Sequence, residues 1–396
     1  MFRIASLACL VACANAHIRS LPDCADCGQG ELRHGLWLSE GEGSIAGGPD
    51  GGVVVLESNA VVFYDRAMRE VRRVALDLQD TALVATAGSD TYVISRAGRA
   101  LTLAAIDRNG VRWRERIGAD PGGNLGLNGI EAGPEGPFLY GTLDVNLPSL
   151  SALGSQIVAF ARDDGAVRWS RSFDPRPLSV APDDAGGAYV AVAEDRVAPD
   201  GRTAIHRCDR SGAILWTRTV SGRVHETYEL VHTVTPTAQG DLAFVGTYPG
   251  GPLAIGDRMF DFVADGGLST YLVVLDRVTG APSEPRILGD SRGGIRNPSH
   301  VLVMPSGALI TSSFPRQLEH DADIDISVLG PTGIQSQLRL GSKGDQFTRA
   351  MAASDDGTLW LSLSSYEESL YPDGALLTVG SQTFAEQGLY VIDLVL

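Results

Sequence analysis

The chain has 396 residues, of which 44% are hydrophobic, and its 32 basic and 48 acidic residues give a formal net charge of −16 at pH 7. Sequence-independent binding to nucleic acid needs a basic face that displaces counterions from the phosphate backbone, so this charge argues against a nucleic acid partner. The length alone would suggest two or three ordinary domains, and the hydrophobic content is sufficient for a large core.

The first sixteen residues have the features of a bacterial export signal. One cation, Arg3, precedes an apolar run that is too short to span a bilayer. Two processing points are possible: the ANA of residues 14–16 suits ordinary secretory cleavage, and the LVAC of residues 10–13 resembles a lipobox that would place a lipid on Cys13. We predict an exported protein and favour lipidation, which implies the outer membrane or periplasm, with secretion as the alternative. A lipid anchor would then be the sole attachment to a membrane.

Residues 17–30 are predicted to form a polar tether that contains Cys24 and Cys27. A CxxC pair can be half of a zinc site or a redox pair, but the chain has no second CxxC and no clustered histidines to complete four ligands. Because an exported protein lies in an oxidising compartment, we favour a disulfide or an inert tether for this pair. No metal is expected here.

The main part of the chain, residues 31–396, is built from a repeated β-hairpin. Residues 157–173, IVAFARDDGAVRWSRSF, contain two alternating strands around an Asp-Asp-Gly turn. The same unit recurs at residues 103–118, 205–220, 271–289 and 326–341. One such unit cannot bury its own apolar face, so a period of roughly fifty residues predicts a radial or stacked array.

Glycine turns set the number of repeats. A strand follows a glycine turn at six places, Gly51, Gly136, Gly187, Gly240, Gly307 and Gly357, and residues 81–95 form a more degenerate copy. The spacing is too irregular for a solenoid with a fixed rise. The sequence therefore predicts an all-β fold, a single seven-bladed β-propeller of four-stranded antiparallel blades.

The two ends of the array predict how the ring closes. The seventh repeat ends with its third strand at Leu389–Leu396, whereas residues 35–52 match a fourth strand and the entry to the next blade. Trp37 there takes the place of Trp169. We expect the N-terminal strand to complete the last blade, which would remove an exposed sheet edge. Trp37, Trp113, Trp169 and Trp216 share one repeat position, which indicates packing between blades.

Three segments, residues 136–173, 240–280 and 357–396, carry a family resemblance. Each has a strand led by glycine, an arm, a strand that ends in Asp or a similar residue, and, where complete, a return strand after a glycine turn. In this order the chain resembles the exported bacterial β-propeller repeat proteins common in myxobacteria. The hairpin is also similar to quinoprotein-type repeats, including those of the outer-membrane assembly lipoprotein family. These resemblances imply the fold and specify no chemistry. An adjacent Cys-Cys pair of the quinone-dehydrogenase type is absent, so no cofactor is expected.

Motifs for catalysis and metal binding are few. The chain has no GxSxG, no Walker A motif and no HExxH. The histidines His206, His225, His232 and His300 have no carboxylate at metal-ligand spacing and are interpreted as structural. Asp321, Asp323 and Asp325 alternate as calcium ligands can, but the following glycine and the bidentate Glu of a calcium loop are missing, so a solvated acidic arm is favoured over Ca²⁺.

The long arms between second and third strands are the predicted binding surface, because loops on a rigid scaffold often carry recognition. The candidate ligand-binding residues are Tyr248, Met259, Phe260, Phe262, Tyr366, Tyr371 and Phe384. We predict a non-catalytic binding or scaffold module for a protein or glycan of the cell envelope. The alternative is a propeller enzyme, such as a lyase or glycoside hydrolase, which would need paired carboxylates or an acid and a base at the central funnel.

Overall fold

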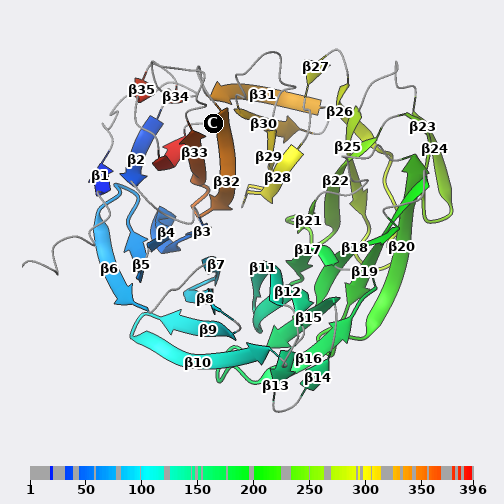
Figure 1. Ribbon diagram of the computed structural model, residues 1–396. Coiled ribbons are helices and arrows are strands. Elements are labelled where there is room, and N and C mark those ends of the chain that lie inside the picture. Colours follow the sequence, from blue (N-terminus) through cyan, green and yellow to red (C-terminus); the bar gives the residue numbers. More distant parts are fainter. Residues whose placement is uncertain are drawn as a thin grey trace, which may run out of the picture.

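Seven antiparallel sheets stand around a central axis in the computed structural model, with one edge of each sheet at the centre and the other at the rim (Figure 1). This confirms the predicted seven-bladed β-propeller, with blades that are mostly four-stranded. The structure describes residues 18–20, 32–38, 44–57, 59–76, 82–98, 100–119, 125–143, 145–147, 150–152, 155–174, 177–195, 200–223, 233–248, 250–262, 269–290, 293–294, 298–304, 306–313, 324–330, 333–340, 345–354, 356–366, 377–379, 382–384 and 388–394.

The first four blades follow one another in chain order, each listed here from the axis outwards. Blade 1 contains β3 (Ile45–Gly47), β4 (Val53–Glu57), β5 (Ala60–Tyr64) and β6 (Glu70–Ala75), with the 3-10 turn η1 (Pro49–Gly51) between its first two strands. Blade 2 contains β7 (Ala82–Ala87), β8 (Asp90–Ala97), β9 (Ala100–Asp107) and β10 (Gly110–Ala119). Blade 3 contains β11 (Leu125–Gly133), β12 (Gly136–Leu143), β15 (Ser155–Phe160) and β16 (Val167–Ser172). Blade 4 contains β17 (Pro177–Pro182), β18 (Ala188–Asp195), β19 (Asp200–Cys208) and β20 (Ile214–Arg223).

The remaining blades bring the chain back to its start. Blade 5 contains β21 (Thr233–Pro236), β22 (Leu242–Tyr248), β25 (Ser269–Leu275), β26 (Arg286–Asp290) and the short β27 (Gly293–Gly294). Blade 6 contains β28 (Pro298–Val303), β29 (Leu309–Ser313), β30 (Ile324–Gly330) and β31 (Gly333–Leu340). Blade 7 contains β32 (Asp345–Ala353), β33 (Leu359–Tyr366), β36 (Gly388–Leu394), β2 (Leu32–Leu38) and β1 (Ile18–Ser20).

Blade 7 closes the ring as predicted. β2 pairs with β36, and Trp37 lies opposite Tyr390 in the register. β1, which falls in the segment expected to be a tether, adds a fifth strand outside β2. On the side of blade 1, Ser354 Oγ donates to the Gly52 carbonyl at 2.6 Å. The first and last parts of the chain are therefore joined within one sheet and across one blade junction.

Tight turns on one face of the disc follow from local sequence chemistry. In the turn between β19 and β20, the Asp209 carboxylate accepts hydrogen bonds from the backbone N–H groups of Ser211 at 2.8 Å and Ala213 at 3.0 Å. Gly212 has a φ of 80°, a conformation that costs a residue with a Cβ roughly 1–2 kcal/mol. An Asp followed closely by Gly was thus a reliable signal for these turns.

The hydrophobic core is divided among the blade junctions. Each buried apolar cluster of the described residues combines two neighbouring blades, and together the clusters cover every junction of the ring. No blade buries its apolar faces alone, which is the physical reason for the ring. Within the described residues, the structure has no helix long and apolar enough to cross a membrane.

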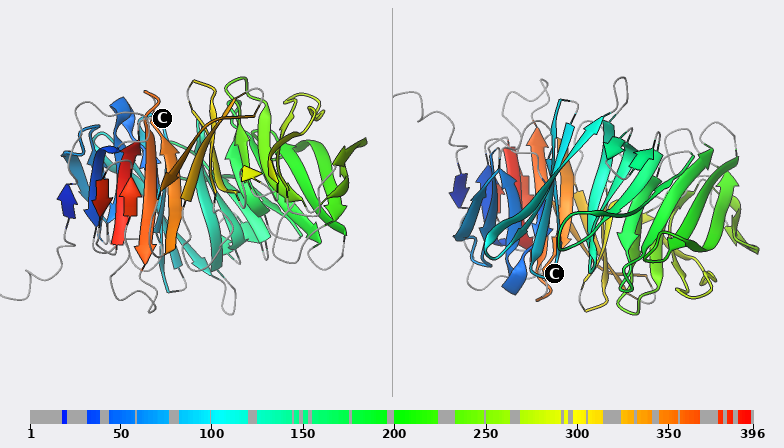
Figure 2. Two further views of the ribbon diagram at one scale, coloured as in Figure 1. Left: turned by 90° about the horizontal axis from the view of Figure 1, so that it is seen from above. Right: turned by 90° about the horizontal axis from the view of Figure 1, so that it is seen from below.

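Two long arms fold as hairpins along the preceding blade. β13 (Val145–Leu147) and β14 (Leu150–Ala152) extend the sheet of blade 2 through pairing of β13 with β10. β23 (Gly251–Ile255) and β24 (Arg258–Phe262) extend blade 4 through pairing of β23 with β20. A third hairpin, β34 (Leu377–Val379) with β35 (Gln382–Phe384), lies near β31. Figure 2 shows the disc from two sides, with the strands crossing its thickness.

Candidate functional site

A cavity of about 510 Å³ lies in the central channel. The inner strands β3, β7, β11, β28 and β32 line it, and Tyr140 of β12 contributes from the second strand of blade 3. This volume is within the range of small-molecule pockets. Most of the side chains that line it are apolar, such as Ile45, Leu83 and Met351, whereas polar atoms make up the larger part of its surface. The few polar side chains of the lining are therefore the groups that could orient a ligand in the channel.

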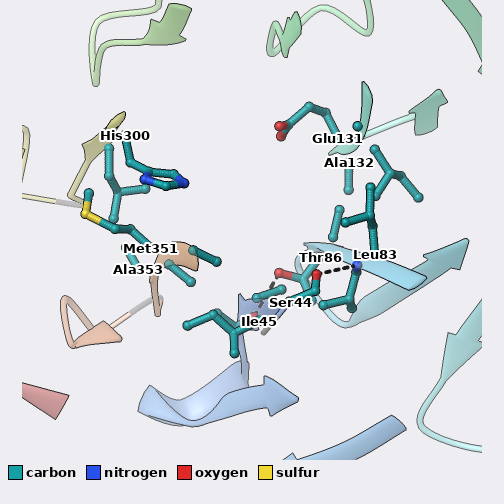
Figure 3. Close-up of a pocket in the computed structure, with 18 of the residues that line it drawn as sticks. Ser44, Ile45, Leu83, Thr86, Glu131, Ala132, His300, Met351 and Ala353 are labelled. Carbon is teal, nitrogen blue, oxygen red and sulfur yellow. Dashed lines mark hydrogen bonds between the residues drawn. The ribbon is translucent and has the colours of Figure 1, made fainter. Parts of the chain in front are cut away.

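Two of the polar side chains in the channel are satisfied by the protein itself. Ser44 Oγ accepts a hydrogen bond from the Val84 N–H at 3.0 Å, and Thr86 Oγ1 donates to the Gly47 carbonyl at 2.8 Å (Figure 3). These two bonds join the inner strands of blades 1 and 2. They hold the wall of the cavity together and leave recognition to other groups.

Glu131 and His300 point into the cavity from β11 and β28 (Figure 3). The Ser312 hydroxyl lies 3.3 Å from His300 Nδ1, which orients the imidazole. Desolvation in the channel raises the pKa of Glu131 to about 8, because burial disfavours its ionised form. Burial also raises the pKa of Tyr140, and the nearby charge of Glu131 adds to that effect. Glu131 is thus the one acidic side chain of the described lining, and its charge affects the pKa of Tyr140.

The described lining offers one carboxylate and one imidazole for catalysis. A glycoside hydrolase of the usual kind needs two carboxylates on either side of the scissile bond. Glu131 is the single Asp or Glu among the described residues that line the cavity. The described lining therefore lacks the two carboxylates of the usual glycoside hydrolase, and it brings one carboxyl group and one imidazole to the same cavity.

Tryptophans on outer strands connect neighbouring blades, as the repeat position predicted. Trp113 Nε1 donates to the Arg162 carbonyl at 2.9 Å, and Trp216 Nε1 donates to the Arg277 carbonyl at 3.0 Å. A Cβ on Gly165 would come within 2.7 Å of the Trp113 ring, so each ring packs on the glycine turn of the next blade. This contact confirms a structural role for Trp113, Trp169 and Trp216, whereas the side chain of Trp37 is outside the described part of the structure.

Ion pairs reinforce the same junctions in blades 2 to 4. The buried Asp90 carboxylate binds Arg112 at 3.1 Å and Arg162 at 2.5 Å. Burial alone would raise the pKa of Asp90, but the hydrogen bonds from Arg162 and Arg112 outweigh burial and lower it. Arg112 also donates to the Arg162 carbonyl at 2.7 Å, so it closes the junction of blades 2 and 3.

The junction of blades 4 and 5 presents apolar side chains to solvent at the equivalent positions. A β-bulge in each outer strand places Arg112 in blade 2 and Arg168 in blade 3, but Leu215 in blade 4. Two residues before the turn glycine, blade 3 has Asp163, whereas blade 5 has Val278. Leu215 is 53% exposed and Val278 is 69% exposed. We call the exposed apolar surface along this junction the blade 4–5 seam, and it consists of Ile214, Leu215, Met259, Val278 and Ile287.

Two arginines of the seam region, Arg218 and Arg258, join blade 4 to blade 5. Arg218 of β20 donates to the carbonyls of Gly280, at 3.1 Å, and Thr279 in the blade 5 turn. Arg258 of β24 donates to the Pro282 carbonyl at 2.7 Å and pairs with Glu284, just before β26. The arm hairpin, β20 and the start of β26 are therefore fastened to one another. The elements that carry the seam residues are thus joined to one another at the junction of blades 4 and 5.

The arm residues predicted to bind a ligand are separated by the structure. Tyr248 and Phe260 are buried in the core between blades 4 and 5, with exposures of 1% and 8%. Met259 is 64% exposed and lies on the seam. Phe262, Tyr366 and Phe384 belong to β24, β33 and β35, where only the backbone is described, and Tyr371 lies outside the described residues.

Other predicted positions have simple environments or lie outside the described residues. Cys208 is a free, buried thiol whose pKa is raised to about 11, mainly by desolvation. His206 Nδ1 lies 2.9 Å from Thr217 Oγ1, and burial lowers the pKa of His206 to about 4. Asp325 is 3% exposed in β30. Of the positions singled out in the sequence, these are also outside the described residues: Cys13, Cys24, Cys27, His225, His232, Asp321 and Asp323. No group of three or more potential metal ligands occurs among the residues that are described.

Sequence reasoning missed Glu131, Leu215 and Val278. Glu131 is the acidic residue of an inner strand, NGIEAGP, and an inner strand with a carboxylate was a usable signal. Leu215 and Val278 could have been found by comparing repeats position by position, because the corresponding positions in blades 2 and 3 are charged. Apolar residues at exposed repeat positions carry information that a search for aromatic residues in long arms does not.

The family described as outer membrane protein assembly factor BamB matches residues 154–281. This segment extends from the third strand of blade 3 to the turn after β25 in blade 5, and it contains four of the five seam residues. Residues 154–281 of the propeller are thus similar to BamB-type repeats, which agrees with the second of the two resemblances above. No curated protein matches the sequence.

Several solved structures are similar to most of the chain. KlHsv2 with loop 6CD replaced by a Gly-Ser linker has a TM-score of 0.50 at 12% identity, and the match covers 86% of this chain and 97% of that chain. BamB from Moraxella catarrhalis has a TM-score of 0.45 at 16% identity, covering 92% and 97%. The quinohemoprotein alcohol dehydrogenase ADHIIG from Pseudomonas putida HK5 has a TM-score of 0.41 at 10% identity, covering 87% and 65%. At such identities a likeness concerns the fold alone.

Proposed function

We propose that this propeller is a non-catalytic scaffold that binds a partner protein of the bacterial cell envelope through the blade 4–5 seam. The observation that carries the proposal is the gathering of exposed apolar side chains on one junction. Of the seven large hydrophobic residues that are exposed in the described part of the chain, five belong to the seam. Exposed apolar surface that is concentrated in one place is typical of protein interaction sites.

The chemistry of the seam favours a protein over a glycan. Its side chains are aliphatic or thioether groups, whereas sugar rings are usually recognised by exposed aromatic rings with hydrogen-bonding neighbours. The arm aromatics Tyr248 and Phe260, which the sequence offered for that role, are buried. Methionine adapts its shape to different apolar partners, and Met259 stands at the arm end of the seam.

The family match supports an envelope location and a protein partner. The family's printed description is that of an outer membrane assembly factor, and its match includes the seam residues Ile214, Leu215, Met259 and Val278. We further propose that the chain is exported and lipidated at Cys13. Cys13→Ala should then move the protein from the membrane fraction to the soluble fraction, and an unchanged distribution would favour ordinary cleavage or retention by other means.

The test of the binding role uses a seam variant and a matched control. Leu215→Glu combined with Val278→Glu should abolish capture of the partner from a native envelope extract, because two charges would have to be desolvated in the interface. Val71→Glu is the control, since Val71 is the bulge residue of blade 1 and is 63% exposed. All variants should unfold at the same temperature as the parent.

The partner of the parent protein, identified by mass spectrometry, should also be captured by the Val71 variant and be missing from the seam double variant. Equal capture by the double variant would contradict binding through the seam. Failure of the folded parent protein to capture any envelope protein would contradict the scaffold role itself.

A further inference from the structure

The central channel contains a carboxyl group that the binding role of the seam does not use. Glu131 projects from β11 into the cavity of about 510 Å³. Among the described residues that line this cavity there is no Lys or Arg to neutralise it. The Glu131 side chain forms no hydrogen bond or ion pair with another described residue, in contrast to Asp90 and Asp183, which each bind arginine.

Neighbouring groups favour a positively charged ligand over a negative or neutral one. Tyr140 lines the cavity next to Glu131 and contributes an aromatic ring, and rings attract ammonium and guanidinium groups through their faces. The formal charge of −16 for the chain lowers the energy of cations near the protein. Besides Glu131 and Tyr140, the described lining has one more titratable group, His300, which is across the channel on β28. The described lining residues of β3, β7 and β32 are not titratable.

We propose that the channel binds a small organic cation, a primary ammonium or guanidinium group, with Glu131 as the carboxylate that pairs with it. The group can belong to a free molecule or to a Lys or Arg side chain inserted into the channel. Desolvation of the Glu131 carboxyl group strengthens the ion pair, because less water screens the two charges. The cavity is large enough for a short aliphatic chain behind the charge.

Binding is linked to a proton. Since the pKa of Glu131 is about 8 without a ligand, the carboxyl group is mostly neutral at pH 6, and a cation must displace its proton. Affinity should therefore increase about fivefold between pH 6 and pH 7 and level off above pH 8. A neutral ligand of the same size should show no such dependence.

The experiment titrates the full chain with n-butylammonium chloride, with methylguanidinium chloride and with the blocked tripeptide Gly-Arg-Gly, while n-butanol is the neutral comparison. The carbon-13 signal of the Glu131 carboxyl group is followed by NMR from pH 5 to pH 10. A saturating cation should lower the pKa of Glu131 by about two units, equivalent to a hundredfold preference for the ionised form. Binding of the tripeptide alone would assign the site to a peptide side chain, and binding of the small cations would assign it to a free molecule.

Glu131→Gln should lose the affinity and the pH dependence, and Glu135→Gln is the matched control. Glu135 is on the same hairpin but outside the cavity, where it pairs with Arg168 at 2.5 Å. The parent protein gives the NMR result whether or not the Gln variant folds. The proposal is overturned if none of the cations shifts the pKa of Glu131, if n-butanol shifts it equally, or if a folded Glu131→Gln variant binds as the parent does.

Discussion

The junction of blades 2 and 3 and the junction of blades 4 and 5 have the same connection but different surfaces. In both, an outer-strand tryptophan donates to a turn carbonyl of the next blade and packs on a turn glycine. At the first junction the bulge residue is Arg112, held by Asp90. At the second the bulge residue is Leu215, which is exposed.

The comparison distinguishes the contacts that join neighbouring blades from the side chains that the blades expose to solvent. Trp216 and Arg207 both donate to the Arg277 carbonyl, so the second junction is closed without help from residue 215. Arg112 joins its junction through Asp90 and the Arg162 carbonyl, whereas the second junction does not depend on Leu215. A repeat position that is structural in one blade can therefore serve binding in another.

The largest effect is expected at the shared glycine contact. Gly165→Ala would place a methyl group 2.7 Å from Trp113 at a φ of 73°, so backbone strain and overpacking together should lower the free energy of unfolding by about 3 kcal/mol. Urea unfolding measures the change. Gly357→Ala is the control because its φ is 86° with no atom near the added Cβ, and it should cost about 1 kcal/mol. Equal costs would show that the tryptophan contact contributes nothing.

The second effect concerns the ion pairs that distinguish the junctions. Asp90→Ala leaves Arg112 and Arg162 without their carboxylate, and we expect a loss of about 2 kcal/mol because both arginines are partly solvated. Since the pKa of Asp90 in the folded protein is below the ordinary 3.8, the stability that Asp90 gives is present at neutral pH and is lost as pH falls below about 4.

The acid dependence gives an independent check of the Asp90 ion pairs. Urea unfolding of Asp90→Asn between pH 3 and pH 7 should show a weaker loss of stability in acid than the parent shows. An identical acid dependence would mean that the arginine contacts do not favour the carboxylate.

A smaller difference in stability is expected among Phe variants of the three tryptophans at one repeat position. Trp113 and Trp216 have hydrogen-bond acceptors, whereas the buried Nε1 of Trp169 has no partner among the described residues. Replacement by Phe removes the same volume in each case, so Trp169→Phe should cost about 1 kcal/mol less than the other two. Thermal unfolding of the three variants measures the order. The same cost in all three would place a water or an undescribed group at Trp169.

The smallest effect on stability, with a large effect on binding, is expected for Leu215→Arg. This change gives blade 4 the residue type of blades 2 and 3 at the bulge, and an exposed position should tolerate it within about 0.5 kcal/mol. Capture of the envelope partner should nevertheless fall at least tenfold in a titration of binding, because the apolar contact is replaced by a charge. Unchanged affinity would exclude Leu215 from the interface.

The blade count and the closure of the ring could be predicted from the sequence because their causes are local. Alternating residues form strands, and glycine at positive φ, such as Gly212, forms turns. The missing fourth strand after Leu389–Leu396 and the extra strand before Ile45 were complementary, so β2 had one place to pair. The candidate site was predicted less well, since the arm aromatics that drew attention include the buried Tyr248 and Phe260.

By itself, the sequence determined the repeat, its turns and the strand that closes the ring, because each depends on neighbouring residues or on one unpaired edge. Only the tertiary structure decided which side chains are left in water and which are taken out of it. Trp216 and Arg277 are 61 residues apart and meet at one junction, which leaves Leu215 exposed beside them. Glu131 likewise has a pKa of about 8 because the inner strands of several blades come together around the channel and desolvate its carboxyl group. Exposure and desolvation are properties of the assembled ring, and no single repeat encodes them.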